Sequence, residues 1–470
     1  MIVKTPIIPE STTFVGDRNS KEISYKDVAF FLATGFFLDD TTFYKNQKCL
    51  KPGAVYEVGI NGAAEFQKHH FTWHYSPRDI SFNEAVDEFA HLMDTIAAEK
   101  LKNRKVILPL SGGLDSRSLA TTVKGWENVH AYSYQFQDSF NETKYGKAIA
   151  DACQWNFSDL SVNKGYLWNV IEQLAAINEC YSDFTHPRQM AFFDDYSKMG
   201  DVFYLGHWGD VLFNDMGVSE SDDFDQLVSI LKKKIIKKGG LELAKAMWEA
   251  WGLSGDFEQE LTNQLSDLLA TIKIDNNNAR IRAFKSLYWA PRWTSVNLNV
   301  FKAVGDMVLP YYEDRMCQFI CSIPETYLAK RKIQIEYIKR FSPELAQIPW
   351  QSFEPLNLYN YQNYFSKKNL PNRLIRKAKS VSANAFGKRN KVTRNWEIQF
   401  LGKQNEKEFT KWLFGNDKFK DFVPTDIVES FYEKFKTQDS VYYSHSVSML
   451  LTLSLFSKQN ANGKKSSIHA

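Results

Sequence analysis

The chain has 470 residues, of which 44% are hydrophobic and 24% charged, a composition that predicts a soluble globular protein of about two domains. Its 58 Lys and Arg residues nearly balance its 55 Asp and Glu residues, so we do not expect a nucleic-acid binder. The five cysteines are scattered, which fits reduced thiols better than a disulfide framework. The first residues carry no signal-peptide pattern, and no apolar stretch is long enough for a membrane span. We therefore expect a cytoplasmic protein without a membrane anchor.

The first 75 residues alternate strand-like pieces with turn signals. The apolar run over 54–60 is followed by Asn61-Gly62, a strong hairpin signal. A capping-box pattern then begins at Ser81 and ends at Glu84, and it predicts a helix that runs up to the next strand. We expect a small β-rich unit before this helix.

The six residues from Ser111 to Ser116 read Ser-Gly-Gly-Leu-Asp-Ser and follow an apolar run over 106–110. This order predicts a buried strand, a tight loop and a helix. The glycines allow a close approach to a ligand, and the loop N–H groups with the helix start can form a cradle for an anion. Asp115 would repel phosphate but suits a Mg²⁺ ion held against it. We expect a phosphate site here; the alternative is a turn that binds nothing.

Strands and helices alternate after the loop. We expect strands over 129–136, 157–162 and 202–205, a helix around 148–152, and a long helical stretch over 165–199. This alternation predicts a doubly wound parallel sheet. Beyond residue 215 the pattern is mostly helical.

Two segments in this part are rich in basic residues. The amphipathic stretch 231–238 is interpreted as a solvated helix face rather than a membrane anchor. The segment 367–394 has many Lys and Arg residues and no acid, which predicts a surface loop. An active-site lid that senses phosphate is the alternative for that segment.

A second polar motif follows the strand predicted at 202–205. Gly206 begins it, and Asp210 is the carboxylate within it. The carboxyl ends of parallel strands line one crevice, so Asp210 is expected to face Asp115 across it. Two such carboxylates could hold one Mg²⁺ ion against a departing pyrophosphate. The alternative is a glycine-rich turn with an exposed Asp.

The loop at 111–116 resembles the pyrophosphate loop of ATP pyrophosphatases. Over about residues 80–350 the chain resembles the asparagine synthetase family, which includes β-lactam synthetases and lasso-peptide cyclases. Residues 206–215 look like a diverged copy of its second motif, and 305–314 fall where its third motif belongs. The positions kept in the second motif are Gly206, Asp210, Leu212 and Phe213. The resemblance implies an α/β fold with a doubly wound parallel sheet of the ATP pyrophosphatase type and a helical C-terminal part.

The third motif departs from the family pattern. The family glutamate that positions the nucleophile corresponds to Asp306, and the motif's Arg corresponds to Val308. Family members also carry a catalytic Lys further on, whereas the segment 347–353 in that region has none. The candidates to replace it are Lys330, Arg331, Lys332 and the segment 367–394.

The resemblance also bears on the domain plan. The family's glutaminase domain needs an N-terminal Cys nucleophile and more residues than precede the loop here, and residue 2 is Ile2. Segments 36–43 and 50–56 look like its last strands. We interpret residues 1–75 as a β-rich remnant without glutaminase activity. The other predicted units are an ATP pyrophosphatase domain over 80–350 and a helical extension over 351–470 that contains the basic segment.

The resemblance implies an ATP-dependent carbon–nitrogen ligase that converts a carboxylate to an amide and releases AMP and pyrophosphate. Its expected cofactors are ATP and Mg²⁺, and its partners are a small carboxylate and ammonia or an amine. A separate ammonia-supplying subunit is an alternative source of nitrogen. The ATP-binding residues are expected to be Leu110, Ser111, Gly112, Gly113, Asp115, Ser116, Tyr134 and Gly206. The expected Mg²⁺ ligands are Asp115 and Asp210, and Asp306 is the expected catalytic orienter or base.

Several functions stay open at this stage. Asparagine synthesis is the default product, whereas the drifted third motif favours another substrate such as a sugar acid, a natural product or a peptide. A non-catalytic nucleotide-binding protein is the alternative of a different class, because the family Lys is missing. RNA binding through 367–394 is a further alternative, and it predicts binding that weakens steeply with salt.

Overall fold

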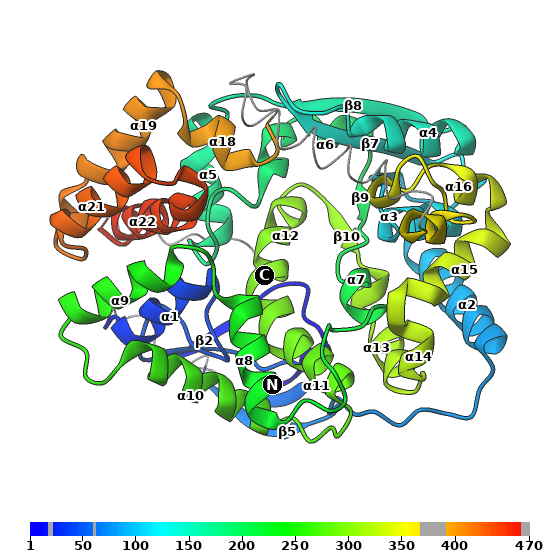
Figure 1. The fold of residues 1–470 in the computed structure, drawn as a ribbon, viewed down its shortest axis with the longest axis horizontal. Helices are drawn as coiled ribbons and strands as arrows, with labels where there is room; N and C mark the ends of the chain where they lie inside the picture. The colour runs from blue at the N-terminus through cyan, green and yellow to red at the C-terminus, as the bar shows by residue number, and fades with distance from the viewer. Residues whose placement is uncertain (17–21, 60–62, 367–391, 462–470) are drawn as a thin grey trace.

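A five-stranded parallel sheet in the order β10-β9-β6-β7-β8 forms the centre of the molecule (Figure 1). The computed structural model describes residues 1–16, 22–59, 63–366 and 392–461. The strands of the central sheet are β6 (Val106–Pro109), β7 (Val129–Phe136), β8 (Asn156–Val162), β9 (Val202–Tyr204) and β10 (Asp306–Val308). All pairings in this sheet are parallel, so the predicted α/β fold with a doubly wound sheet is confirmed.

Helices cover both faces of the sheet because the chain crosses it in two directions. From β6 it proceeds outward through α3 (Asp115–Thr122), β7 and α4 (Thr143–Cys153) to β8. It then returns through α5 (Leu167–Asn178) and α6 (Tyr196–Met199) to β9, on the other side of β6. Right-handed crossovers in opposite directions place their helices on opposite faces. Every residue of β9 is buried, as expected for a strand covered on both faces.

The helix before the central sheet forms as the sequence predicts. Helix α2 (Phe82–Leu101) begins with a complete capping box, in which the Ser81 hydroxyl accepts from the Glu84 N–H and the Glu84 carboxylate accepts from the Ser81 N–H. Its buried face packs against α3 and α15 (Lys332–Phe341). These contacts support the helix that follows the 111–116 loop.

Two small antiparallel sheets lie in the N-terminal part. They consist of β1 (Ile2–Lys4), β4 (Ala54–Val58) and β5 (Ala64–His69), and of β2 (Phe14–Gly16) and β3 (Gln47–Cys49). The predicted hairpin after residue 54 is confirmed by the pairing of β4 with β5, although Asn61-Gly62 lies outside the described residues. Helix α1 (Tyr25–Thr34) belongs to the same part of the chain.

Most of the remaining chain is helical. The helices between β9 and β10 are α7 (Gly209–Leu212), α8 (Phe224–Ile235), α9 (Gly240–Ala250), α10 (Phe257–Ala270), α11 (Asn277–Phe284), a π-helix (Lys285–Thr294) and α12 (Ser295–Lys302). Those after β10 and before residue 366 are α13 (Asp314–Cys321), α14 (Glu325–Leu328), α15 and α16 (Pro343–Gln347). The C-terminal group is α18 (Asn395–Phe400), α19 (Lys403–Phe414), α20 (Asp417–Lys420), α21 (Thr425–Thr437) and α22 (Ser440–Ala461). Short 3₁₀ turns cover Arg188–Phe192, Pro310–Tyr312, Ala329–Arg331, Gln351–Phe353 and Tyr361–Phe365.

The long helical stretch expected over 165–199 is wrong in part. Helix α5 ends at Asn178, and Glu179 and Cys180 that follow have positive φ angles of 48° and 59°. Left-handed residues end an α-helix, and Pro187 then prevents its continuation. The chain resumes as a short 3₁₀ turn and as α6. Periodicity alone does not reveal these interruptions.

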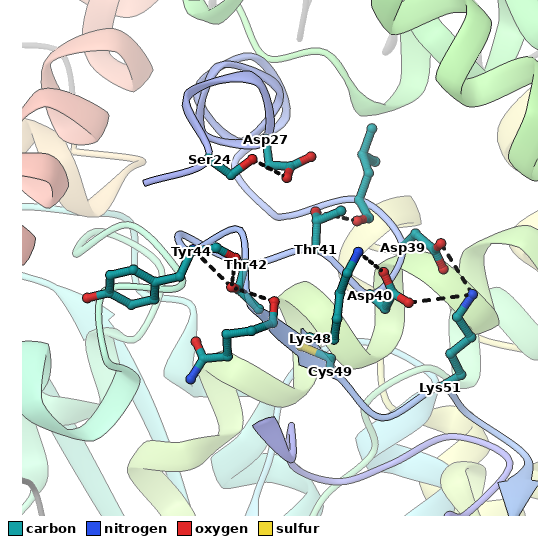
Figure 2. A network of polar contacts seen from close by, with 12 residues as sticks. Ser24, Asp27, Asp39, Asp40, Thr41, Thr42, Tyr44, Lys48, Cys49 and Lys51 are labelled. Carbon is teal, nitrogen blue, oxygen red and sulfur yellow. Dashed lines mark hydrogen bonds and ion pairs between the residues drawn. The ribbon is translucent and has the colours of Figure 1, made fainter. Parts of the chain in front are cut away.

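The strand expected over 36–43 is also wrong, because these residues form a loop held by side chains. The Thr42 hydroxyl accepts from the Tyr44 N–H and donates to backbone carbonyls of Tyr44 and Gln47. Figure 2 shows this network together with the ion pairs of Lys48 with Asp40 and of Lys51 with Asp39 and Asp40. Hydroxyl side chains that bond nearby backbone groups compete with a strand ladder.

The N-terminal part and the C-terminal helices share one hydrophobic core with the rest of the chain. Helix α1 packs against α9, and α9 packs against α22 (Figure 1). The proposed domain limits, and the interpretation of residues 1–75 as a remnant, stay predictions. The basic segment lies outside the described residues over 367–391. In the described ranges, no helix combines the length and apolar character needed to cross a bilayer.

A buried histidine joins α22 to α1. The Nε2 atom of His445 bonds to the carbonyl oxygen of Leu32 at 2.9 Å, and burial lowers the pKa of His445 to about 4. The charges of Lys237 and His186 contribute to this decrease, whereas Asp183 opposes it. An unfolded histidine has a pKa of about 6.5, so the unfolded chain takes up this proton first as the pH falls.

We therefore expect the free energy of unfolding to fall as the pH decreases from about 6.5 towards 4, by up to about 1.4 kcal/mol per pH unit for this side chain. The stabilisation is present in full above pH 6.5, because both states are then neutral at this position. His445→Gln should flatten this part of the profile, measured by urea unfolding between pH 4 and 8. The exposed His91 on α2 is the matched control, and His91→Gln should leave the slope unchanged. Equal slopes in wild type and His445→Gln would contradict the assignment.

Candidate nucleotide site

The strand order places two loops at one point of the sheet. Strands β6 and β9 are neighbours in the sheet, but the chain leaves them on opposite sides, which makes their boundary the switch point of the topology. The 111–116 loop follows β6, and residues 206–210 follow β9. Ligands of open α/β sheets bind outside the carboxyl ends of strands at such a point. The structure thus brings the two predicted motifs together.

The 111–116 loop leads into a helix whose start has no side-chain cap. The Ser116 hydroxyl accepts from the Ser111 N–H at 3.1 Å, and the two hydroxyls lie 3.0 Å apart. Helix α3 begins at Asp115, and its N-cap residue Leu114 makes no side-chain capping hydrogen bond. The N–H groups of its first turn are therefore available to an anion. Gly113 lies beside the Ser111 hydroxyl, and its N–H donates to it at 3.3 Å.

Gly112 packs tightly against a distant part of the chain. A Cβ at this position would collide with Gln351 and Tyr145, and the Gly112 carbonyl accepts from the Gln351 N–H at 3.2 Å. Only a residue without a side chain allows this contact. The loop is thereby held between α4 and the segment after α16.

Asp115 is the central carboxylate of the site. Its side chain is 27% exposed, and its Oδ1 atom accepts from Arg331 and, at 3.0 Å, from the Gln334 amide. Gln334 is fully buried and also donates to the Tyr311 hydroxyl at 2.8 Å. Burial raises the pKa of Asp115 to about 6, and the charge of Asp210 adds to the rise, while Arg331 and Gln334 lower it. A carboxylate with a raised pKa beside a specific charged partner is typical of a functional site.

The second motif is shaped around Asp115. Trp208 has a positive φ of 79°, and helix α7 begins at Gly209 directly after it. A Cβ on Gly209 would collide with the Asp115 carboxylate, and a Cβ on Gly206 would lie 3.1 Å from the Asp115 Cβ. These glycines let the two loops touch. Asp210 on α7 is exposed and close enough to Asp115 to affect its pKa.

A buried arginine from α11 holds this motif in place. Arg282 is 2% exposed and donates to the backbone carbonyls of Val211 and Asn214. Its guanidinium also pairs with both oxygens of Glu325. The ion pair with Glu325 holds the guanidinium in position, and its two hydrogen bonds to backbone carbonyls fix the segment after β9.

The other predicted ATP-binding residues lie along the same edge of the sheet. Leu110 is buried, and its N–H donates to the Tyr132 carbonyl at 2.7 Å. Tyr134 lies near the carboxyl end of β7, where its hydroxyl accepts from Arg188 Nε at 2.6 Å. The guanidinium of Arg188 also lies over the Tyr134 ring, 5.6 Å from its centroid.

Asp306 lies away from the two loops, a position that does not support its predicted role as orienter or base, and that role stays a prediction. It pairs in register with Val202, at the start of β9, whereas the site lies beyond the end of that strand. At about 3.3 Å per strand residue, Asp306 lies roughly 13 Å along the strand from the level of Gly206. Its side chain is 72% exposed and forms an ion pair with Arg104 at 2.9 Å. The match of residues 305–314 to the third family motif assigned Asp306 to the site, whereas the structure places it at the opposite edge of the sheet.

Asp306→Ala is accordingly expected to leave ATP cleavage at the wild-type level. The loss of its exposed ion pair should reduce the free energy of unfolding by less than about 1 kcal/mol. Steady-state product formation and urea unfolding would measure the two quantities. A large loss of turnover with unchanged stability would contradict the placement of Asp306 outside the site.

Sequence reasoning did not identify Gln334 and could not choose Arg331 among the basic candidates. Lys330 and Arg331 both have left-handed backbone angles, with φ of 59° and 63°, and this turn directs Arg331 towards Asp115. Lys332 instead donates to the Thr326 carbonyl. No pattern in the sequence marks two consecutive left-handed residues that are neither Gly nor Asn.

The fold and the site define a doubly wound α/β domain with a nucleotide-type loop and a pair of carboxylates at its switch point. Residues 89–226 match the family model described as asparagine synthase, so this part of the chain is similar to an asparagine synthase domain. No curated protein matches the sequence. Among solved structures, an NMN synthetase from Francisella tularensis is similar over 44% of this chain and 92% of its own, at 12% identity. The TM-score of 0.22 is too low for this likeness to support any inference.

Proposed function

We propose that the protein is an ATP-dependent ligase that activates a substrate carboxylate with release of pyrophosphate and transfers the acyl group to ammonia or an amine, with release of AMP. The observation that carries the proposal is the position of Asp115, at the start of an uncapped helix, in contact with Arg331 and close enough to Asp210 for the charge of Asp210 to raise its pKa. An anion cradle, a cation and two carboxylates are the groups that phosphate-transfer chemistry requires.

The loop at 111–116 and the start of α3 would bind the phosphate groups of ATP. The N–H groups of the first turn of α3 and the hydroxyls of Ser111 and Ser116 are the donors available to phosphate oxygens. The uncapped helix start fits a nucleotide triphosphate. Tyr134 would border the base on the neighbouring strand, at a ring face already occupied on one side by Arg188.

Arg331 supplies the positive charge that the missing family Lys would provide. Its guanidinium is 13% exposed and bonded to Asp115 and to Gln334. A guanidinium fixed in this way can donate to an oxygen that gains negative charge during bond breaking, without reorganisation. The carboxylate of Asp115 would act as a positioning group that holds Arg331.

The carboxylates also fit a Mg²⁺ ion. The second oxygen of Asp115, Oδ2, has no partner among the described residues, and Asp210 is exposed beside it. Over all described residues, no group of three or more His, Cys, Asp and Glu side chains is arranged as a metal site. Asp115 Oδ2 and Asp210 would hold the ion, and phosphate oxygens and water would complete its shell. Bound there, Mg²⁺ would neutralise charge on the pyrophosphate leaving group.

The proposed nitrogen donor is free ammonia or an amine, with a separate ammonia-supplying subunit as the other source. All five cysteines are buried. Burial raises the pKa of Cys49, the cysteine in the N-terminal part, to about 11, although Arg292 opposes this rise. A thiol with such a pKa is a poor nucleophile at neutral pH. The proposal therefore assigns no glutamine hydrolysis to this part of the chain.

Nucleotide product analysis tests the proposed function. The full chain would be incubated with Mg-ATP, ammonium and a panel of carboxylic acids that begins with aspartate, and AMP would be separated from ADP. We expect AMP and pyrophosphate in equal amounts with at least one acid. Formation of ADP instead would overturn the proposed reaction. Tight binding of Mg-ATP without turnover on any acid would favour a non-catalytic nucleotide-binding protein.

A further inference from the structure

A second cavity, of about 320 Å³, lies outside the phosphate loop and is bordered by four segments of the chain. These are the stretch after α5, the connection between α8 and α9, the start of α18 and the first turns of α22. Its titratable lining residues are Asp183, His186, Arg188, Lys237, Lys238, Arg394 and His445, of which His445 is neutral at neutral pH. Lys and Arg side chains therefore outnumber the single carboxylate by four to one.

The single carboxylate of this basic cavity is already satisfied. Asp183 is 4% exposed and accepts from the N–H and hydroxyl of Thr185, at 2.8 and 2.9 Å, and from the His186 N–H at 3.2 Å. The His186 ring nitrogen Nδ1 lies 2.9 Å from both of its oxygens. These bonds keep Asp183 ionised, so the cavity has one negative charge against four basic side chains.

The basic side chains of the cavity have no ion pair with an acidic side chain that the structure describes. Among the described residues, no carboxylate lies within ion-pair distance of Arg188, Lys237, Lys238 or Arg394, although the chain has many such pairs elsewhere. The Lys237 ammonium lies over the rings of Trp289 and Trp293, 5.6 and 5.5 Å from their centroids. Burial lowers the pKa of Lys237 and the charge of Asp183 only partly opposes this change, as expected for a cation removed from water.

The basic cavity adjoins the candidate nucleotide site through one side chain. Arg188 lines the cavity and donates to the hydroxyl of Tyr134, the residue expected to border the nucleotide base. Asn395, which also lines the cavity, donates to the Thr185 carbonyl at 3.0 Å and ties α18 to this wall. A molecule in the cavity would therefore lie next to the nucleotide.

We propose that the basic cavity binds an anionic group, a carboxylate or a phosphate, of the acid that the enzyme activates, so that this substrate carries a second negative charge besides the carboxylate that reacts. The inference rests on the proposed function for the identity of the ligand, whereas the anion site itself stands on the lining side chains. Partly buried cations attract an anion more strongly than exposed ones because water screens them less. Acids without a second charge would then be poor substrates.

Calorimetric titration of the full chain tests the anion site directly. Inorganic phosphate and succinate serve as separate probes, each in the presence of saturating Mg²⁺ and a non-hydrolysable ATP analogue, so that the phosphate loop is filled. We expect one site for at least one probe, and the stronger probe identifies the phosphate or carboxylate source. Lys237→Met and the exposed Arg394→Gln should each weaken binding by about tenfold.

Lys233 on α8 is the matched control, because it is exposed and outside the cavity, and Lys233→Met should bind as wild type does. No binding of either probe, or equal binding in all variants, would overturn the anion site. The folded state of each variant is checked by its unfolding midpoint, and Arg394→Gln removes an exposed side chain without burying a void. Failure of the analogue to bind, with anion binding intact, would instead count against the proposed function alone.

Steady-state kinetics tests whether the substrate carries a second negative charge. If the cavity binds that charge, acids with a second charge should yield AMP. Lys237→Met should then raise the KM for these acids by about tenfold while the KM for ATP is unchanged. Equal turnover of singly and doubly charged acids would overturn the substrate assignment.

Discussion

Asp115→Ala is expected to lower the rate of AMP formation by at least about 100-fold while the protein stays folded. The substitution removes the acceptor that holds Arg331 and one of the two carboxylates proposed to hold Mg²⁺. Gln334 would lose one of its bonds but keep the one to Tyr311. Arg331 would be left largely buried with Gln334 as its partner, so the free energy of unfolding should decrease by about 1–3 kcal/mol.

The measurement is release of AMP and pyrophosphate at saturating Mg-ATP, together with circular dichroism to confirm folding. Asp151 offers a matched control, because it lies exposed on α4 and pairs only with Lys147 one helical turn away. Asp151→Ala should retain full activity. Wild-type turnover by Asp115→Ala would refute the assignment of the site.

Arg282→Met is expected to cost about 3–5 kcal/mol of unfolding free energy. The substitution leaves the Glu325 carboxylate, 14% exposed, without its bidentate partner, and it frees the carbonyls of Val211 and Asn214. The loop that carries Asp210 would lose an anchor, so the KM for Mg-ATP should also rise. Urea unfolding followed by fluorescence gives the first quantity, and steady-state kinetics gives the second.

Arg315 provides the comparison, because it also contacts both oxygens of a glutamate, Glu99, but is 40% exposed. Arg315→Met should cost less than about 1 kcal/mol, since water screens an exposed pair. Similar losses in the two variants would show that burial does not set the strength of the Arg282 pair.

The central sheet and the phosphate loop were predictable because local signals agreed there. The run over 106–110 is apolar and ends in a glycine pair, and the strand over 129–136 appears with the bounds that its sequence suggests. Continuously apolar strands that alternate with amphipathic helices are typical of a parallel sheet covered by helices on both faces. The meeting of the 111–116 loop with Gly206 follows from strand order once the sheet is known.

The rest of the site depends on contacts that sequence patterns do not encode. Arg331 reaches Asp115 only because two consecutive residues adopt left-handed angles. Asp306 was misplaced because β10 has three residues, and a motif match cannot tell which edge of the sheet a short strand presents. Arg282 enters from a helix more than sixty residues after the loop that it anchors, so no local pattern could have indicated it.

The aromatic contacts between the two ends of the chain have a consequence for how this protein can change over evolution. The rings of Phe31 and Phe37 stack with their centroids 4.5 Å apart, and the ring of Phe37 contacts that of Phe43 edge-on. The ring of Phe43 in turn stacks on Phe456 of α22, with a centroid separation of 3.8 Å. Deleting the first 75 residues would remove the rings that pack on Phe456 of α22. The packing of the N-terminal part alone is therefore a reason for the protein to keep it, and a catalytic fragment cut from the middle of the chain should precipitate rather than fold.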